Sequence, residues 1–196
     1  MVVNKPAGLL TVPGRGADKM DSLTTRVQRE FPDALCVHRL DMSTSGLLVL
    51  ARGREMHGHL SRLFRERLVR KRYTAIITGR LQADFGEIDL PLGSDWPNRP
   101  LQRIDLAKGK GSLTRYRLLA DDAATDTSRV ELEPVTGRTH QLRVHMAAIG
   151  HPVAGDRLYG VQNGSTGDRL MLHASMLSFS LPFSTTPLHF ECTAPF

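Results

Sequence analysis

The sequence is poor in cysteine and aromatic residues and has no long apolar run. Only two of its 196 residues are cysteines, and Phe, Trp and Tyr together make up 6%, which excludes a disulfide-built scaffold. The longest apolar run, residues 47–51, is far below the ~20 residues that a membrane-spanning helix needs. The first apolar stretch is interrupted by Asn4 and Lys5, so we expect no secretory signal. A cytoplasmic protein with free thiols at Cys36 and Cys192 is the expectation.

Motifs of several enzyme classes are also missing. No glycine-rich fingerprint of a phosphate loop or a dinucleotide fold is present, so an ATP or NAD role has no support. The eight histidines are scattered. His57 and His59 are two positions apart and His140 and His145 are five apart, and neither pair has the i, i+4 spacing of a zinc-binding helix. We therefore expect no metal and no nucleotide cofactor.

The size and balance of the chain are those of an ordinary globular protein. The mass is 21.7 kDa, 40% of the residues are hydrophobic and 23% are charged, as is typical of soluble domains. A chain of this length buries roughly 70% of the surface that it exposes when unfolded. Since no repeat or long linker divides it, we predict a single domain over residues 1–196.

Hydrophobic patterning predicts an α+β fold with a mixed, mostly antiparallel β-sheet core and flanking helices. Six or more strands are expected, with no strict strand–helix alternation. They include a strand buried on both faces at 47–51, a single strand at 85–93, and a hairpin formed by 112–120 and 128–134. The predicted helices are 22–31, capped by Asp21; about 55–68; and one after Gly137 that ends at Gly150.

Positive charge is concentrated in one segment. Lys and Arg number 26, of which 21 are Arg, against 20 Asp and Glu, which gives a net charge of +6. Residues 52–72 alone hold eight bases and two acids, and the rest of the chain holds 18 of each. On the helix predicted at 55–68, Arg54, Arg62 and Arg65 would face outward. A basic segment in a neutral body indicates binding to a polyanion.

Three positions are candidates for chemistry. Asp41 precedes a buried strand and is surrounded by possible hydrogen-bond donors, so either a catalytic carboxylate or a turn-capping residue is possible. A hydrolase triad of His38, Asp41 and Ser45 is disfavoured, since no Gly-x-Ser-x-Gly elbow is present. In "GRTHQLRVH" one arginine is expected to point inward and to need a carboxylate partner. Tyr73 either packs in a sheet or offers a ring for a base.

"HRLDMSTSGLLVLAR" at 38–52 resembles the signature of the RluA-type pseudouridine synthases. Three further blocks resemble that family in the same order: "VVNKPAGLLTVPGR" at 2–15, "KRYTAIITG" at 71–79 and "GRTHQLRVHMAAIGHPVAGDRLYG" at 137–160. Together they extend from residue 2 to about residue 160. The segment "SDWPNRP" at 94–100 is most similar to the large-subunit pseudouridine synthase A branch. No block resembles the S4-like domain that many relatives carry, so RNA affinity is expected to come from the catalytic domain itself.

The resemblance implies an isomerase that converts a uridine in an rRNA or tRNA stem-loop to pseudouridine without cofactor or metal. It implies that Asp41 is the nucleophile, that the flipped base stacks on Tyr73, and that Arg143 pairs with Asp41. Arg39 would enter the RNA stack that the uridine leaves, since a base must be extruded before its glycosidic bond is accessible. The residues predicted to contact RNA are His38, Arg39, Thr44, Arg62, Arg65, Arg138 and His140.

Two other classes stay open at this point. A non-catalytic RNA-binding module would keep the basic face but would not need Asp41, Tyr73 and Arg143 together. A hydrolase that uses Asp41 as a base would need a second acid or a metal nearby. We expect a monomer that acts on structured RNA, with no membrane and no protein partner.

Overall fold

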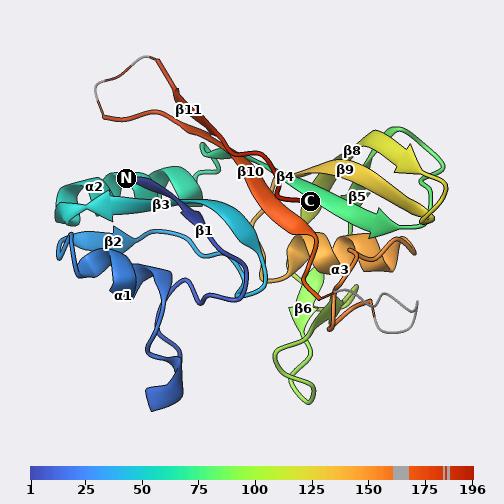
Figure 1. Ribbon diagram of the computed structural model, residues 1–196, viewed down its shortest axis with the longest axis horizontal. Helices are drawn as coiled ribbons and strands as arrows, with labels where there is room; N and C mark the ends of the chain where they lie inside the picture. Colours follow the sequence, from blue (N-terminus) through green and yellow to red (C-terminus); the bar gives the residue numbers. More distant parts are fainter. Residues whose placement is uncertain (161–167, 183, 185) are drawn as a thin grey trace. The chain divides into compact units, whose positions relative to one another are not determined.

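The computed structural model describes residues 1–160, 168–182, 184 and 186–196 of the chain (Figure 1). The chain forms two compact units. Unit 1 comprises Met1–Lys71 and His173–Pro195, and unit 2 comprises Arg72–Leu172 and Phe196. The prediction of one domain over 1–196 stays a prediction.

Unit 1 is built on the buried strand β3 (Ser45–Arg52), of which all residues except Arg52 are buried. The strand β1 (Val2–Lys5) pairs with it antiparallel, and β10 (Leu172–Phe179) pairs with it in parallel. The strand β2 (Ala34–Cys36) pairs antiparallel with β3, and β11 (Leu188–Glu191) pairs antiparallel with β10. The sheet is therefore mixed and mostly antiparallel, as predicted.

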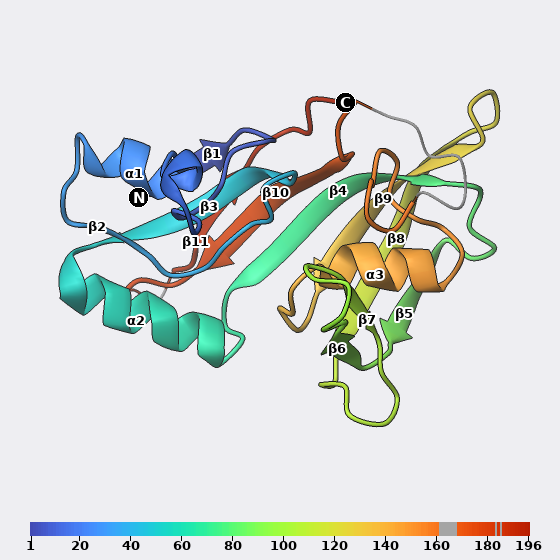
Figure 2. The same ribbon diagram turned by 90° about the horizontal axis from the view of Figure 1, so that it is seen from below.

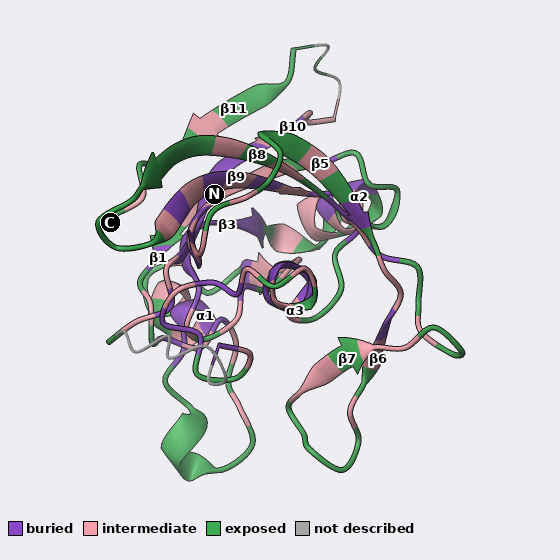
Figure 3. Ribbon diagram, turned by 90° about the vertical axis from the view of Figure 1, so that its right-hand side faces the viewer, coloured by how far each residue is buried: buried purple, intermediate pink, exposed green. Residues whose placement is uncertain are grey.

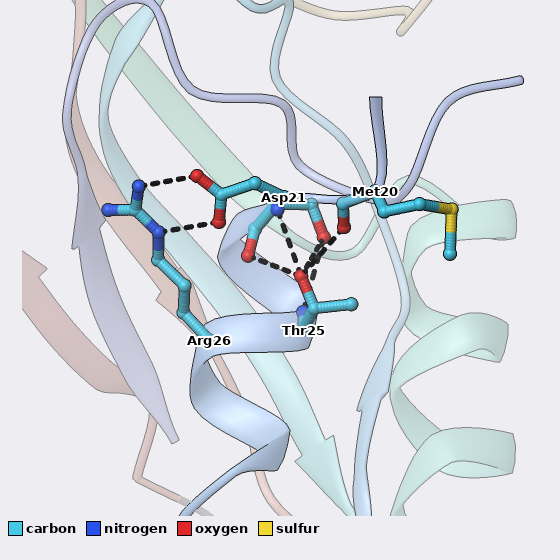
Figure 4. Close-up of polar contacts among 5 residues, drawn as sticks. Met20, Asp21, Thr25 and Arg26 are labelled. Atoms are coloured by element: carbon cyan, nitrogen blue, oxygen red, sulfur yellow. Dashed lines mark hydrogen bonds and ion pairs between the residues drawn. The ribbon is translucent and has the colours of Figure 1, made fainter. Parts of the chain in front are cut away.

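The helix α1 (Leu23–Gln28) begins with a capping box (Figure 4). The Ser22 hydroxyl accepts a hydrogen bond from the backbone N–H of Thr25, and the Thr25 hydroxyl accepts one from the backbone N–H of Ser22. The prediction that Asp21 caps this helix is wrong. Its carboxylate instead accepts two bonds from Arg26, at 2.8 and 2.6 Å, because the hydroxyl one residue later satisfies the free N–H of the first turn.

The helix α2 (Gly53–Arg65) packs against β3 (Figure 2). Leu60 and Leu63 are buried in the core of unit 1, together with Leu47, Val49 and Phe179. The helix begins two residues before the predicted start and ends three before the predicted end. Arg54, Arg62 and Arg65 are exposed, as the helical phase predicts.

Unit 2 contains an antiparallel sheet in the order β4-β9-β8-β5. The helix α3 (Gln141–Ala148) contacts β8 and β9 (Figure 2), and its Leu142 and Met146 share a core with Val130 and Leu132. The predicted hairpin is confirmed. The strands are β4 (Arg70–Thr78), β5 (Phe85–Asp89), β8 (Leu113–Asp122) and β9 (Thr127–Pro134).

The prediction of one strand at 85–93 is wrong. Two strands form here: β5 pairs with β8, while β6 (Leu92–Ser94) pairs with β7 (Gln102–Ile104) in a separate two-stranded sheet. Pro91 lies between them and has no N–H to continue a ladder. This short β6–β7 ribbon carries the segment 94–100 and contacts α3.

Candidate active site

Asp41 lies on the loop that leads into β3 and is half-buried. Its carbonyl accepts a hydrogen bond from the backbone N–H of Thr44 at 3.1 Å, which closes a turn. On the preceding side, the Thr11 hydroxyl donates to the carbonyl of Leu40 at 2.8 Å and accepts from the N–H of Leu40 at 3.2 Å. On the following side, the N–H of Gly8 donates to the carbonyl of Met42 at 2.8 Å. The N-terminal segment therefore fixes the backbone on both sides of the aspartate.

A fully buried lysine lies beneath this loop. The Nζ of Lys5 donates to the carbonyls of Pro6, Leu9 and Met42 at 2.9, 2.8 and 3.0 Å. Burial lowers the pKa of Lys5 to about 8, against the attraction of the negative charge of Asp41. At neutral pH the side chain is still mostly an ammonium ion, so it places a positive charge near the aspartate.

His38 is part of the packing of unit 1. Its ring stacks on Phe64 with 4.4 Å between centroids, and its Nε2 accepts a hydrogen bond from the N–H of Val49 at 3.0 Å. Burial, followed by the positive charge of Lys71, lowers the pKa of His38 to about 3. The imidazole is therefore neutral at physiological pH, and its Nε2 is occupied by the backbone of β3.

The polar residues after Asp41 also have structural partners. Thr44 is only 2% exposed, which does not favour a direct contact with RNA. The Ser45 hydroxyl lies 2.9 Å from Nδ1 of His173, and His38 is bonded to Val49, an arrangement that does not build a His38–Asp41–Ser45 triad. Arg39, by contrast, is exposed, as a residue that enters an RNA stack must be.

Glycine is required where β3 begins. Gly46 has φ +110, and a Cβ there would lie 2.4 Å from the carbonyl oxygen of Ala174 on β10. Any side chain would force the two parallel strands apart. The glycine of the "TSG" motif thus sets the strand spacing beneath the Asp41 loop.

In unit 2, the inward-pointing arginine is Arg143 on α3, which is 4% exposed. Its Nε and Nη2 donate to the two carboxylate oxygens of Asp156, each at 2.7 Å, and Asp156 is also buried. The N–H groups of Leu158 and Tyr159 donate to the same carboxylate. The predicted carboxylate partner is therefore present, and it is Asp156. The pairing of Arg143 with Asp41 stays a prediction.

Tyr159 connects this ion pair to its surroundings. Its ring lies 5.2 Å from the guanidinium carbon of Arg143. Its hydroxyl is 2.7 Å from Nδ1 of His140 and accepts a bond from the N–H of Gln102 at 2.9 Å. His140 precedes α3 with a left-handed backbone, φ 54. Arg143 and His140, both predicted from the sequence, are therefore held by one tyrosine that the sequence analysis did not identify.

Arg138 and Tyr73 occupy different environments in unit 2. Arg138 is exposed on the surface. Its backbone N–H donates to the Gln141 side chain at 3.0 Å. Tyr73 on β4 lies opposite Leu132 and packs against the core of this unit. Sheet packing of Tyr73 is thus confirmed, and its role as a platform for a base stays a prediction.

Neither a metal site nor a membrane span emerges from the described part of the chain. Among those residues, no three His, Cys, Asp or Glu side chains gather in a group that could hold a metal ion. Within the same residues, no helix combines the length and the apolar character needed to cross a membrane.

Solved structures with the same fold define the class of the protein. Human RNA Pseudouridylate Synthase Domain Containing 1 matches with a TM-score of 0.81 and 36% identity, over 100% of this chain and 80% of that one. Human RNA Pseudouridylate Synthase Domain Containing 4 matches with a TM-score of 0.77 and 27% identity, over 99% of this chain and 85% of that one. The fold is that of the pseudouridylate synthases.

Sequence comparison gives the family. Residues 1–148 match the RNA pseudouridylate synthase family. The Dual-specificity RNA pseudouridine synthase RluA of Yersinia pestis is 50% identical over 100% of this chain and 95% of its own length, and that of Escherichia coli strain K12 is 48% identical over 100% and 90%. The chain belongs to this family and is an RluA-type isomerase that converts uridine in RNA to pseudouridine. This decides against the hydrolase and the non-catalytic RNA-binding module.

Proposed function

We propose that this chain acts on a specific uridine in a stem-loop of large-subunit ribosomal RNA, transfer RNA or both. The relatives named for dual specificity support more than one RNA substrate. The exposed arginines of α2, Arg62 and Arg65, support binding of the phosphate backbone. In the reaction the bond from C1′ of the ribose to N1 of uracil breaks, the bond from C1′ to C5 forms, and the C5 proton is lost as N1 gains one.

The proposed nucleophile is Asp41, and the observation that carries this role is the way its loop is built. The backbone is bonded on both sides of the residue, while a buried ammonium group at Lys5 attracts its charge. The carboxylate anion is the form of an aspartate that attacks as a nucleophile, and the charge of Lys5 is opposite to the charge of that anion. In the same proposal the extruded base stacks on Tyr73, and Arg143 pairs with Asp41 when the site is assembled.

The test is Asp41→Asn with synthetic stem-loops of both RNA classes. We expect this near-isosteric change to keep the thermal melting temperature and RNA affinity and to abolish pseudouridine formation, measured by chemical mapping. Asp18→Asn, at an exposed aspartate of a 3₁₀ turn (Ala17–Lys19), is the matched control and should keep full activity. Activity of Asp41→Asn within tenfold of the wild type would remove Asp41 from the nucleophile role.

We also propose that the protein works in the cytoplasm as a monomer. Both cysteines are free, and burial raises the pKa of the Cys36 thiol, which supports unreactive thiols in a reducing compartment. Cell fractionation and the mass measured by light scattering test the two parts separately.

A further inference from the structure

The single tryptophan of the chain lies on the surface. Trp96, in the loop that joins β6 to β7, is 68% exposed, although tryptophan is on average a well-buried residue. The guanidinium carbon of Arg99 lies 3.3 Å from the centre of its ring. Since one face of the ring is covered by Arg99 and two thirds of the residue is still exposed, the opposite face is open to solvent.

The loop that presents Trp96 is held in shape by its own hydrogen bonds. The N–H of Asp95 donates to the carbonyl of Leu101 at 3.0 Å, and the N–H of Leu101 donates to the carbonyl of Asn98 at 3.0 Å. The Asn98 side-chain amide donates to the carboxylate of Asp95 at 2.9 Å. A ligand that stacks on the ring would therefore find its surface already ordered, which reduces the entropy lost on binding.

The loop is attached directly to the candidate active site of unit 2. Gln102, the first residue of β7, donates its N–H to the Tyr159 hydroxyl, which also lies 2.7 Å from His140. The Tyr159 ring in turn lies over the guanidinium of Arg143. The ribbon of β6 and β7, with its connecting loops, lies on the outside of the unit and is coloured as mostly exposed or intermediate (Figure 3).

We propose that Trp96, backed by Arg99, is a stacking platform for an unpaired base of the RNA substrate outside the target uridine. This inference rests on the proposed function and adds a specificity contact to it. A base has an apolar face that stacks on an aromatic ring, and an arginine behind that ring adds a cation–π contribution. The segment 94–110 carries four basic and two acidic residues, and both Arg99 and Arg103 are exposed. This excess of positive charge favours an RNA over a protein partner that is apolar or has few acidic residues.

Because Trp96 is the only tryptophan, its fluorescence reports on the platform itself. We expect a stem-loop RNA with unpaired loop bases to quench the fluorescence of the wild-type chain, and a fully paired duplex of equal length to quench it much less. Stacking of one base is worth about 1–3 kcal/mol, so Trp96→Leu should raise the Kd for fluorescein-labelled stem-loop by about five- to 150-fold. Trp96→Phe, which keeps a ring, should lose clearly less affinity.

The matched control is Phe85→Leu, which removes another exposed aromatic ring, on β5, and should leave the Kd unchanged. Thermal melting of Trp96→Leu should match the wild type, since the ring is mostly exposed. Absence of quenching together with an unchanged Kd in Trp96→Leu would overturn the platform, and equal quenching by the paired duplex would do so as well. Pseudouridine mapping on the same stem-loop separates the two proposals. Product without quenching overturns the platform alone, and quenching without product in any RNA overturns the proposed function.

Discussion

Each of the two units buries a basic side chain in its part of the candidate site, and the two side chains are held by different means. In unit 1, Lys5 is held by three backbone carbonyls. In unit 2, Arg143 is held by both oxygens of the Asp156 carboxylate. The first cation is surrounded by dipoles, and the second is paired with an anion.

The difference indicates separate tasks for the two cations. All three hydrogens of the Lys5 ammonium are used by the carbonyls, so Lys5 acts on Asp41 through its charge. The bidentate pair of Arg143 fixes the position and plane of the guanidinium. We infer that unit 1 tunes the charge around its carboxylate, whereas unit 2 fixes the geometry of its arginine.

The largest effect is expected from breaking the buried pair in unit 2. Arg143→Met leaves the buried Asp156 carboxylate without its partner, and breaking such a pair typically lowers the free energy of unfolding by about 3–5 kcal/mol. Urea unfolding measures this loss. Arg138→Met, at an exposed arginine of the same segment, is the matched control and should stay within about 0.5 kcal/mol of the wild type. A double variant, Arg143→Met with Asp156→Leu, should lose less than the sum of its single changes.

Arg39 sharpens the same comparison, since it is an exposed arginine of unit 1 that lies two residues before Asp41. Arg39→Met should leave stability nearly unchanged and slow pseudouridine formation. Its defect should shrink on an RNA whose target uridine is already unpaired, because extrusion from a stack requires a few kcal/mol, whereas Arg143→Met should be defective on both RNAs. If Arg39→Met is the more destabilising change, or its defect is equal on both RNAs, the two roles are exchanged.

A smaller loss is expected at the lysine of unit 1. Lys5→Met removes the donor from three carbonyls, and an unsatisfied buried acceptor costs about 1–3 kcal/mol. We expect a total loss of about 2–3 kcal/mol in the free energy of unfolding, since the loop relaxes toward water. Lys19→Met, at an exposed lysine, is the control. A Lys5→Met variant as stable as Lys19→Met would show that the three bonds contribute nothing net.

The sign of the pH dependence distinguishes the two cations further. The pKa of Lys5 is about 8 in the folded chain and about 10.5 when it is unfolded, so between these values the unfolded chain binds more protons. Its contribution to stability is therefore complete above pH 10.5 and falls as the pH is lowered to 8. The stability difference between wild type and Lys5→Met should accordingly increase from pH 8 to pH 10.5. A difference that decreases over this range would contradict the dipole-held lysine.

His38 should make unit 1 sensitive to acid. Its pKa is about 3 in the folded chain, against about 6.5 unfolded, so its contribution is complete above pH 6.5 and is lost as the pH falls toward 3. Between pH 7.5 and pH 5 this amounts to about 2 kcal/mol. His38→Gln should flatten the pH dependence of urea unfolding over that range, and His189→Gln, at an exposed histidine of β11, is the matched control variant. Parallel curves for wild type and His38→Gln would show that the ring titrates normally.

Local patterns in the sequence predicted much of this fold, because their physics is local. The unbroken apolar run of β3 and the phase of α2 needed no information about distant residues. The prediction of a single strand at 85–93 failed because β5 and β6 pair with different strands, β8 and β7. Strand pairing is a long-range property, and Pro91 is the only local sign of the break between the two strands. Asp21 failed as a cap because Ser22 competes for the same N–H groups.

The site residues show the same division. One arginine of the segment 137–145 was expected to be buried with a carboxylate, but nothing in the spacing identifies Asp156, thirteen residues after Arg143, as that carboxylate. Tyr159 was missed for the same reason. Lys5 had a readable signal, a lysine that ends an apolar strand just before a proline, yet its three acceptors come from two separate loops. Partners across a fold depend on tertiary packing, which no local pattern encodes.

The smallest effect per residue is expected on the exposed face of α2, where no burial amplifies a charge. Each phosphate contact contributes a log–log salt slope of about −0.7 on single strands and about −0.9 on a B-form DNA duplex. Reversing Arg62 and Arg65 to Glu should therefore weaken RNA binding, and it should reduce the steepness of the salt dependence by about one to two. Arg26→Glu with Arg29→Glu, on and next to α1, gives the same change of net charge away from α2 and should have a clearly smaller effect.

The affinity of each variant is measured by anisotropy of labelled stem-loop at several salt concentrations. If affinity is independent of salt, α2 faces something other than RNA. If only one of the two arginines matters, the exposed face of α2 meets the RNA edge-on, since Arg62 and Arg65 lie nearly one turn apart on the same side of the helix.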